Sequence, residues 1–337
     1  MQRQLIQNWV ASVGYSGSKS NYLQRTQPLN YLAPGLLTPP TTLAQQQAAQ
    51  AAGVYSALNS GLSASSTGKS NRIDPRFNAV SVVTSSANSN YNSFQASLSR
   101  RFSASYGFTA AYTFSKSIDD VSDALGVLET DVAAQQDPFN NRNNRAVSAF
   151  DVPQRFVLSN EFISKFKGLQ NKWLSQAANG WELTGIFQAQ SGLPEDLLAG
   201  TVAGITDGTL LGGNGAQRPN LVGPLKVALQ PNPGGGANNP NLITNSGLAQ
   251  PLIGQFGTLG RNVLRLNPLI EFDPALSRQF AIREHLKLKL QAQVFNIFNN
   301  TTFSLPGVSL SSPSTFGYYS GTDTNSRRIA LTRRLTC

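Results

Sequence analysis

Charged side chains, cysteine and histidine are all scarce in this sequence of 337 residues. Asp, Glu, Lys and Arg make up 13% of it, about half the share that is usual in soluble domains. Cysteine occurs once, at Cys337, and histidine once, at His285, which excludes a disulfide framework and the spacing of a zinc site. Because no nucleophile, base and orienting group form a recognisable set, we expect no enzyme, no cofactor and no metal.

Long hydrophobic runs are missing as well. No stretch of 18 or more apolar residues occurs, which excludes transmembrane helices. The net charge is +10, but the basic residues stand singly or in pairs such as Arg100-Arg101 and Arg333-Arg334, mostly near the ends of expected strands. We interpret them as solvated strand-end charges and expect no nucleic-acid partner.

The most regular pattern that is present lies at residues 286–300, LKLKLQAQVFNIFNN. Its first nine residues alternate apolar and polar side chains, which is the period of a β-strand. A run of about ten residues with one oily and one charged face, closed by aromatic residues, indicates a transmembrane strand between lipid and a water-filled interior. An edge strand of a soluble sandwich also alternates, so this stretch alone leaves both interpretations open.

The same alternation recurs along the chain and predicts about nine strands, without a competing helical pattern. The expected strands are 5–16, 80–86, 91–101, 107–117, 154–162, 181–191, 269–280, 286–294 and 327–336. Irregular excursions are expected at 17–79, 118–152, 192–267 and 300–325. The first of them contains the segment QQQAAQAAG at 45–53, which could form a short helix but carries no apolar stripe, and we expect this excursion to lie over or beside the sheet.

Counted back from the C-terminus, the connections between these strands alternate between long and short. Outer-membrane barrels alternate short periplasmic turns with long external loops in this way, whereas a sandwich has no reason to place its long loops at one end. We therefore predict an all-β fold: a partial, antiparallel, up-and-down transmembrane β-barrel sheet with long extracellular loops, in the cell outer membrane among its lipid and lipopolysaccharide. The alternation fails near the start, where a short turn expected at 87–90 falls on the side of the long loops.

The polar strand faces and one acidic loop supply candidates for contact with an extracellular ligand that the sequence does not identify. The lumen-facing candidates are Glu182, Gln188, Glu271, Asp273, Lys287 and Lys289, and the loop candidates are Asp119, Asp120 and Asp123. The acidic loop lacks the D-x-D-x-D-G spacing of a calcium site. The ordinary polarity of a barrel wall accounts for the same residues without a ligand.

Several sequence blocks occur in a fixed order over nearly the whole chain. They are VGYSGSKSNYL (13–23), SNYNSFQASLSRRFSASYGFTAAYTFSKSID (89–119), DVPQRFVLS (151–159), GWELTGIFQAQSGLP (180–194), AQVFNIFNNTTF (292–303) and RRIALTRRL (327–335). Each block is loose alone, but the ordered set is more specific. It resembles the TonB-dependent receptor-like outer-membrane barrels of the Oar-like type.

This resemblance implies that residues 1–337 are the C-terminal part of a barrel that has about twenty-two strands in intact members and a plugged lumen. Such receptors are gated importers of large substrates, energised through a TonB-binding segment near their start. The opening MQRQLIQNWV lacks a basic start and an apolar core. We expect no signal peptide, plug domain or TonB-binding segment in this chain, so TonB would be engaged only through a missing N-terminal region.

Two hypotheses for function follow. The first is a fragment of such a receptor or transporter for an unknown substrate, a glycan or a peptide, that does not transport by itself. The second is a surface adhesin or structural outer-membrane β-protein whose long loops meet a partner.

Overall fold

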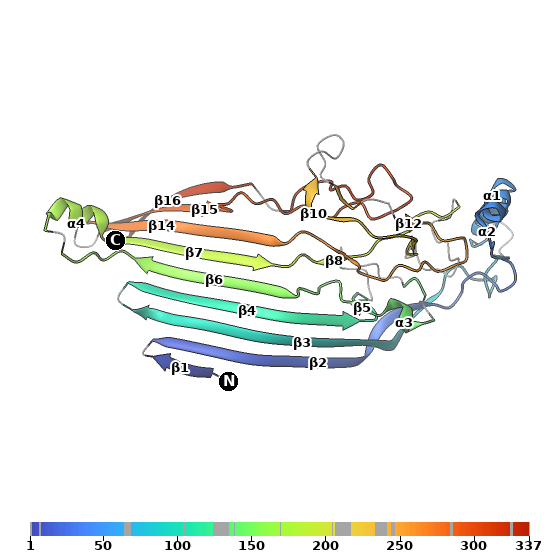
Figure 1. Cartoon of the computed structure of the whole chain (residues 1–337), viewed down its shortest axis with the longest axis horizontal. Helices are drawn as coiled ribbons and strands as arrows, with labels where there is room; N and C mark the ends of the chain where they lie inside the picture. The colour runs from blue at the N-terminus through green and yellow to red at the C-terminus, as the bar shows by residue number, and fades with distance from the viewer. Residues whose placement is uncertain are drawn as a thin grey trace.

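The computed structural model describes residues 2–6, 8–63, 69–103, 105–123, 135–137, 139–168, 170–203, 205, 217–232, 241–243, 247–283, 286–323 and 326–336. His285 and Cys337 lie outside these residues. The main feature is a ten-stranded antiparallel sheet in which strands pair in up-and-down order (Figure 1). Its strands are β1 (Gln2–Ile6), β2 (Trp9–Pro28), β3 (Ser81–Ser103), β4 (Tyr106–Asp119), β6 (Gln154–Ile163), β7 (Trp181–Gln190), β14 (Leu269–Arg283), β15 (Leu286–Phe295) and β16 (Arg328–Thr336), with the short β5 (Ala146–Val147) beside β4.

The register of this sheet keeps apolar side chains on one face from β2 to β16. Partners in antiparallel strands share a face, and one row runs from Leu183 of β7 through Leu276 and Ala292 to Leu331 of β16. These side chains are not covered by a second layer: Leu276 is 41% exposed and Leu331 80%. The apolar face therefore needs an apolar solvent, and the structure does not place it inside a sandwich.

Aromatic rings cross the same apolar face. Phe156, Phe187 and Phe272 follow one another on β6, β7 and β14 with ring centroids 6.0 and 6.3 Å apart. Phe272 also lies against Gly185, where an added Cβ would come within 2.8 Å of its ring. Glycine at this position allows the ring to lie flat along the strand.

The first strands are longer than the sequence predicted, and this removes the break in the alternation of connections. The strand expected at 5–16 is two strands, β1 and β2, separated at Asn8, which has a φ of 74°. The excursion expected at 17–79 begins only after Pro28. The turn expected at 87–90 is wrong, because its Ser, Ala and Asn residues continue β3 and pair with β2. Pairing with the long strand β2 therefore outweighed the turn preference of these residue types.

The other strands agree closely with the prediction, apart from their ends. β4 extends to Asp119, so the excursion expected at 118–152 begins two residues later, and β14 extends to Arg283 rather than to Phe280. The excursions contain small elements of their own. These are α1 (Leu43–Ala51), α2 (Val54–Ser60), α3 (Asn141–Asn144), β8 (Pro194–Glu195), β9 (Asn220–Leu221), β10 (Val227–Asn232), β11 (Asn241–Ile243), β12 (Leu248–Ala249) and β13 (Leu264–Arg265), while α4 (Lys172–Ala178) lies in the β6–β7 connection.

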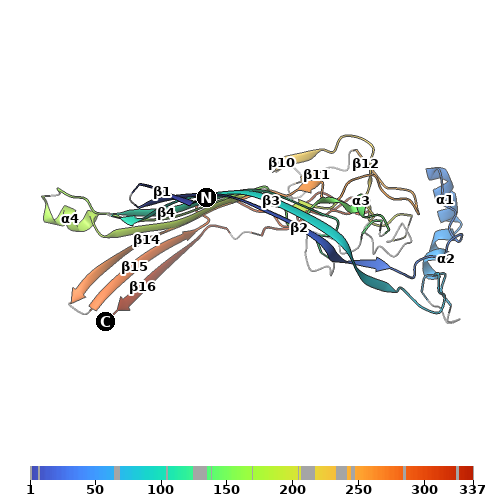
Figure 2. The same cartoon turned by 90° about the horizontal axis from the view of Figure 1, so that it is seen from below.

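The long connections gather at one end of the sheet and α4 lies at the other (Figures 1 and 2). We call these the loop end and the turn end. The helices α1 and α2 lie beyond the strand ends at the loop end, whereas the first excursion was expected to lie over or beside the sheet. In the part of the chain that the structure describes, no helix is long and apolar enough to cross a membrane.

The large buried apolar side chains gather in two clusters at the loop end. One cluster joins the third and fourth excursions and contains Leu197, Ile243, Leu259, Leu264, Phe316 and Tyr319. A second joins the first and third excursions and contains Leu32, Tyr55, Ile205 and Ile253. The long connections therefore fold against one another as a small packed body.

The sheet is an open, curved wall (Figure 2). Among the described residues, β1 pairs only with β2, and β16 pairs only with β15. The all-β, antiparallel, up-and-down prediction is confirmed, and a closed barrel is not formed by the strands described.

Candidate ligand-lining surface

The face of the sheet opposite the apolar one carries all six lumen candidates. The register pairs Gln188 with Glu271 and Glu182 with Ser277. The second of these rows continues through Gln291 of β15 to Thr332 of β16. Lys287 and Lys289 lie on the same face of β15 as Gln291, in the rows of Ala281 and Gln279. The alternation that predicted their facing is thus matched by the pairing of neighbouring strands, while a role in ligand contact stays a prediction.

Glu182 and Lys289 meet across β14. Lys289 Nζ lies 2.8 Å from Glu182 Oε2, and Ser277 Oγ donates to the same carboxylate oxygen at 2.9 Å. Both charged side chains remain about one third exposed. An ion pair of this kind contributes about 0–1 kcal/mol, so it orders the polar face more than it stabilises the sheet.

The other acidic candidates on this face are also held by hydrogen bonds. Gln188 Nε2 donates to Glu271 Oε2 at 2.9 Å. Asp273 Oδ1 accepts the backbone N–H of Asn296 at 2.7 Å, just where β15 ends. The Lys287 side chain is exposed, and it lies nearer the turn end than the other five candidates.

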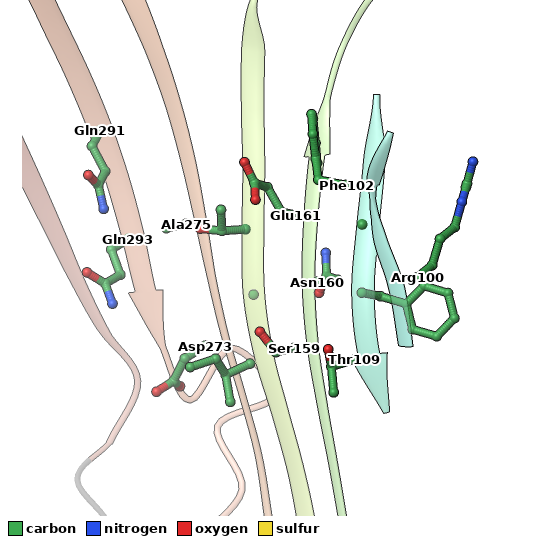
Figure 3. Close-up of a pocket in the computed structure, with 15 residues that line it drawn as sticks. Arg100, Phe102, Thr109, Ser159, Asn160, Glu161, Asp273, Ala275, Gln291 and Gln293 are labelled. Carbon is green, nitrogen blue, oxygen red and sulfur yellow. The ribbon is translucent and has the colours of Figure 1, made fainter. Parts of the chain in front are cut away.

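A shallow hollow of about 460 Å³ lies along the polar face. Its polar-face lining includes Thr109, Ser159, Glu161, Thr184, Asp273, Gln291 and Gln293. In Figure 3, Gln291 and Gln293 of β15 and Glu161 and Ser159 of β6 lie around the hollow, whereas Arg100 points away. Amide, hydroxyl and carboxylate groups without a covering layer suit a water-filled passage better than a closed binding pocket.

The acidic loop candidates Asp119 and Asp120 are buried at the loop end and paired with arginines. Asp119 contacts Arg261 in an ion pair whose two side chains are 2% and 6% exposed, and Ser122 Oγ donates to Asp119 Oδ2 at 2.8 Å. Asp120 Oδ1 lies 3.4 Å from Arg145 Nη1, and its other oxygen accepts the N–H of Asn88 at 3.1 Å. The geometry favours a structural role for both carboxylates.

Asp123, the third loop candidate, is partly exposed and borders residues outside the described part of the chain. In the part described, no three His, Cys, Asp or Glu side chains are grouped so that they could hold a metal ion.

Two arginine partners of the loop-end carboxylates, Arg261 and Arg265, come from the Gly- and Pro-rich third excursion, where no sequence pattern marks them. Arg265 Nη2 lies 2.8 Å from Asp151 Oδ2. Arg218 is 3% exposed and donates to the carbonyls of Leu259 and Asn143 at 2.8 and 2.7 Å. These contacts join residues between 41 and 114 positions apart, and local sequence patterns carry no information about such pairs.

Asp196 is a further buried carboxylate of this network, 4% exposed. Burial raises its pKa above the ordinary value, although the N–H of Asn262, at 2.5 Å from Asp196 Oδ1, and the nearby Arg218 and Arg261 act in the opposite direction. Burial likewise lowers the pKa of Arg218. The network thus places charged side chains in a poorly solvated site, where removing one partner of an ion pair destabilises the fold.

A second hollow, of about 670 Å³, opens at the loop end where α3 approaches β2 and β3. Its lining consists of Arg25, Gln27, Thr84, Ser86, Phe139, Asn140, Asn141 and Arg142. Asn141 Nδ2 donates to the carbonyl of Ser86 at 2.9 Å, and the Phe139 ring packs edge-on against Tyr31 at 5.3 Å. No sequence pattern marks this site, because its residues come from three separate segments. Amides, hydroxyls and one half-exposed ring suit a polar, uncharged or anionic ligand.

Comparison with known proteins gives a family and a likeness to solved structures. The family described as "Outer membrane beta barrel domain" matches residues 1–330. No curated protein matches the sequence. Among solved structures, the outer membrane transporter YddB from Escherichia coli is similar, with a TM-score of 0.46 and 11% identity; the match covers 99% of this chain and 31% of that one.

Proposed function

The chain belongs to the family of outer membrane beta barrel domains and lies in the outer membrane, and from this premise we propose that it is part of the wall of a TonB-dependent receptor or transporter. The observation that carries the proposal is the two-sided sheet. Its apolar face is exposed along its whole width, and its polar face bears hydrogen-bonded Glu, Gln, Lys and Ser side chains. In a membrane, such a wall separates lipid from a wet interior.

The distribution of the connections supports a receptor rather than a plain pore. All long connections lie at the loop end, where they pack into two apolar clusters and bury several arginine–carboxylate pairs. A packed body of this kind can present fixed side chains to an extracellular ligand, as loops held by a rigid scaffold commonly do. We assign first contact with the ligand to the hollow beside α3, and later passage to the polar face.

The TonB dependence rests on the ordered sequence blocks that resemble Oar-like receptors. In that arrangement the energy would reach the wall through a plug domain and a TonB-binding segment, so the wall lines the path and does not drive transport. The ligand class suggested by the lining of the loop-end hollow is a glycan or a polar peptide.

Uptake by cells tests this proposal. Cells that express the intact gene, and cells from which it is deleted, would be given fluorescently labelled oligosaccharides and, separately, a labelled tryptic peptide mixture. We expect one class to accumulate only with the gene, and accumulation to stop when an uncoupler dissipates the proton-motive force. Gene-dependent surface binding that is unchanged by the uncoupler would instead support an adhesin.

A further inference from the structure

The connection between β6 and β7, residues 164–180, exposes large apolar side chains at the turn end. Phe166, Trp173 and Leu174 are 55%, 81% and 58% exposed. They lie around α4, which Figures 1 and 2 place beyond the ends of the neighbouring strands. Exposed aromatic and aliphatic groups gathered in one connection mark a surface that meets something apolar.

Hydrogen bonds hold the backbone of the described part of this connection, residues 164–168 and 170–180, so the exposure is not that of a loose loop. Ser164 Oγ donates to the carbonyl of Ala178 at 2.8 Å, and Asn179 Oδ1 accepts the N–H of Phe166 at 2.5 Å. Asn171 caps α4 by accepting the N–H of Trp173 at 2.9 Å. These bonds hold the apolar side chains outward in a defined arrangement.

The C-terminal turn of α4 is attached on the side of the sheet that faces lipid. Arg278 and Trp181 are paired on the apolar face, and the guanidinium lies 5.3 Å from the indole. Arg278 Nη1 and Trp181 Nε1 both donate to the carbonyl of Ala177, at 3.1 and 2.8 Å. A lipid-facing arginine is tolerated near a membrane interface and not at its centre. The attachment therefore places α4 at the boundary of the bilayer.

The charge of this region has one dominant sign. Residues 164–180 contain Lys165, Lys167 and Lys172 and no acid. The segments that border the turn end, 100–106, 161–182, 278–289 and 333–336, contain eleven Lys and Arg residues against three Glu. Such a surface complements a negatively charged one.

We propose that residues 164–180 form an interfacial anchor that rests on anionic phospholipid headgroups at the turn side of the membrane. Phe166, Trp173 and Leu174 enter the boundary between headgroups and acyl chains, where aromatic side chains are favoured. Lys165, Lys167 and Lys172 contact the phosphates, and Arg278 ties the anchor to the transmembrane strands. This inference rests on the outer-membrane placement and not on transport or on TonB.

A spectroscopic experiment tests the anchor directly. The protein, purified from outer membranes with Cys337→Ser and Trp173→Cys, would carry an environment-sensitive fluorophore at residue 173 and be reconstituted into phosphatidylcholine nanodiscs with or without phosphatidylglycerol. We expect quenching by nitroxide-labelled lipid to increase severalfold with phosphatidylglycerol. Each juxtamembrane lysine contributes roughly a fivefold preference for an anionic surface, so Lys→Gln at 165, 167 and 172 together should abolish the increase.

A matched control separates the anchor from overall charge. Lys→Gln at 19, 69 and 226 removes the same charge at the loop end and should leave the increase intact. Heat-modifiable gel mobility reports whether each variant is folded. The proposal is overturned if folded protein shows equal quenching with and without phosphatidylglycerol. It is also overturned if the probe is open to aqueous iodide in every nanodisc yet shielded in cells, which would indicate a protein partner.

Discussion

The sheet of this chain exposes apolar side chains on one face, whereas the loop end buries them. In the sheet, Phe114, Leu276 and Leu331 are 53%, 41% and 80% exposed, and pairing between strands supplies the order. At the loop end, Leu197, Leu264 and Tyr319 are at most 2% exposed, as in a water-soluble domain. The difference shows that one chain is built for two solvents. Lipid covers the apolar side chains of the sheet, and packing between the excursions covers those of the loop end.

The largest effect is expected from the buried ion pair of the loop end. Asp119→Ala removes the carboxylate that contacts Arg261, in a site where both side chains are nearly inaccessible. Removing one partner of such a pair costs about 3–5 kcal/mol. Hydrogen exchange should show fast opening of the excursions while β14 and β15 stay protected. Equal loss of protection in the sheet would mean that the two regions are not separate. The double variant Asp119→Leu with Arg261→Met should be less damaging than either single change.

A charge on the apolar face of the sheet should come next. Leu276 stands near the middle of β14, and Leu276→Arg should cost about 2–4 kcal/mol of folding free energy in a bilayer. Gln291→Arg, one row away on the polar face, is the control and should cost much less. Denaturant titration in lipid vesicles measures both. Equal costs would contradict the facing of the two rows.

The third prediction concerns pH and again separates the two regions. Burial raises the pKa of Asp196 in the folded loop end above the ordinary 3.8. The folded form therefore holds its proton more tightly than the unfolded one. The loop end should gain stability as the pH falls through the raised pKa toward about 3.8, and lose it again as the pH rises. Each unit by which folding raises the pKa of Asp196 corresponds to about 1.4 kcal/mol of stability.

Asp196→Asn should remove this gain, because the amide oxygen still accepts the N–H of Asn262 but does not titrate. Asp74 does not interfere in that range, because its bonds to Arg76 lower its pKa to about 2 and its contribution is lost only as the pH falls through that value. Protease resistance of the excursions between pH 7 and 4 measures the effect. An identical pH profile in the variant would show that Asp196 is not the source of the pH dependence.

The smallest effect is expected on the polar face of the sheet. Lys289→Gln breaks the ion pair with Glu182, but both side chains are partly solvated and Ser277 still donates to the carboxylate. Folding stability should change by less than about 1 kcal/mol. The same vesicle titration applies, and a loss as large as that of Leu276→Arg would mean that Lys289 is buried.

The sequence was a good guide to the sheet and a poor guide to the loop end, for a physical reason. Alternation is a local signal, and it placed Glu182, Gln188 and Lys289 on one face before any pairing was known. It failed at 87–90, where Ser and Asn suggested a turn although β2 was long enough to pair there. The contacts of Asp119 with Arg261 and of Asp151 with Arg265 join distant segments. Nothing local marks them, so the sequence suggested exposed acids where the structure has buried pairs.

The most direct test of the two-solvent account is the accessibility of adjacent residues on β15. Single cysteines at Leu290 and Gln291, in protein with Cys337→Ser, would be exposed in intact outer membranes to a membrane-impermeant maleimide. We predict that Gln291→Cys reacts readily and that Leu290→Cys reacts only after the protein is unfolded in detergent. Equal labelling of both positions in the intact membrane would contradict the account.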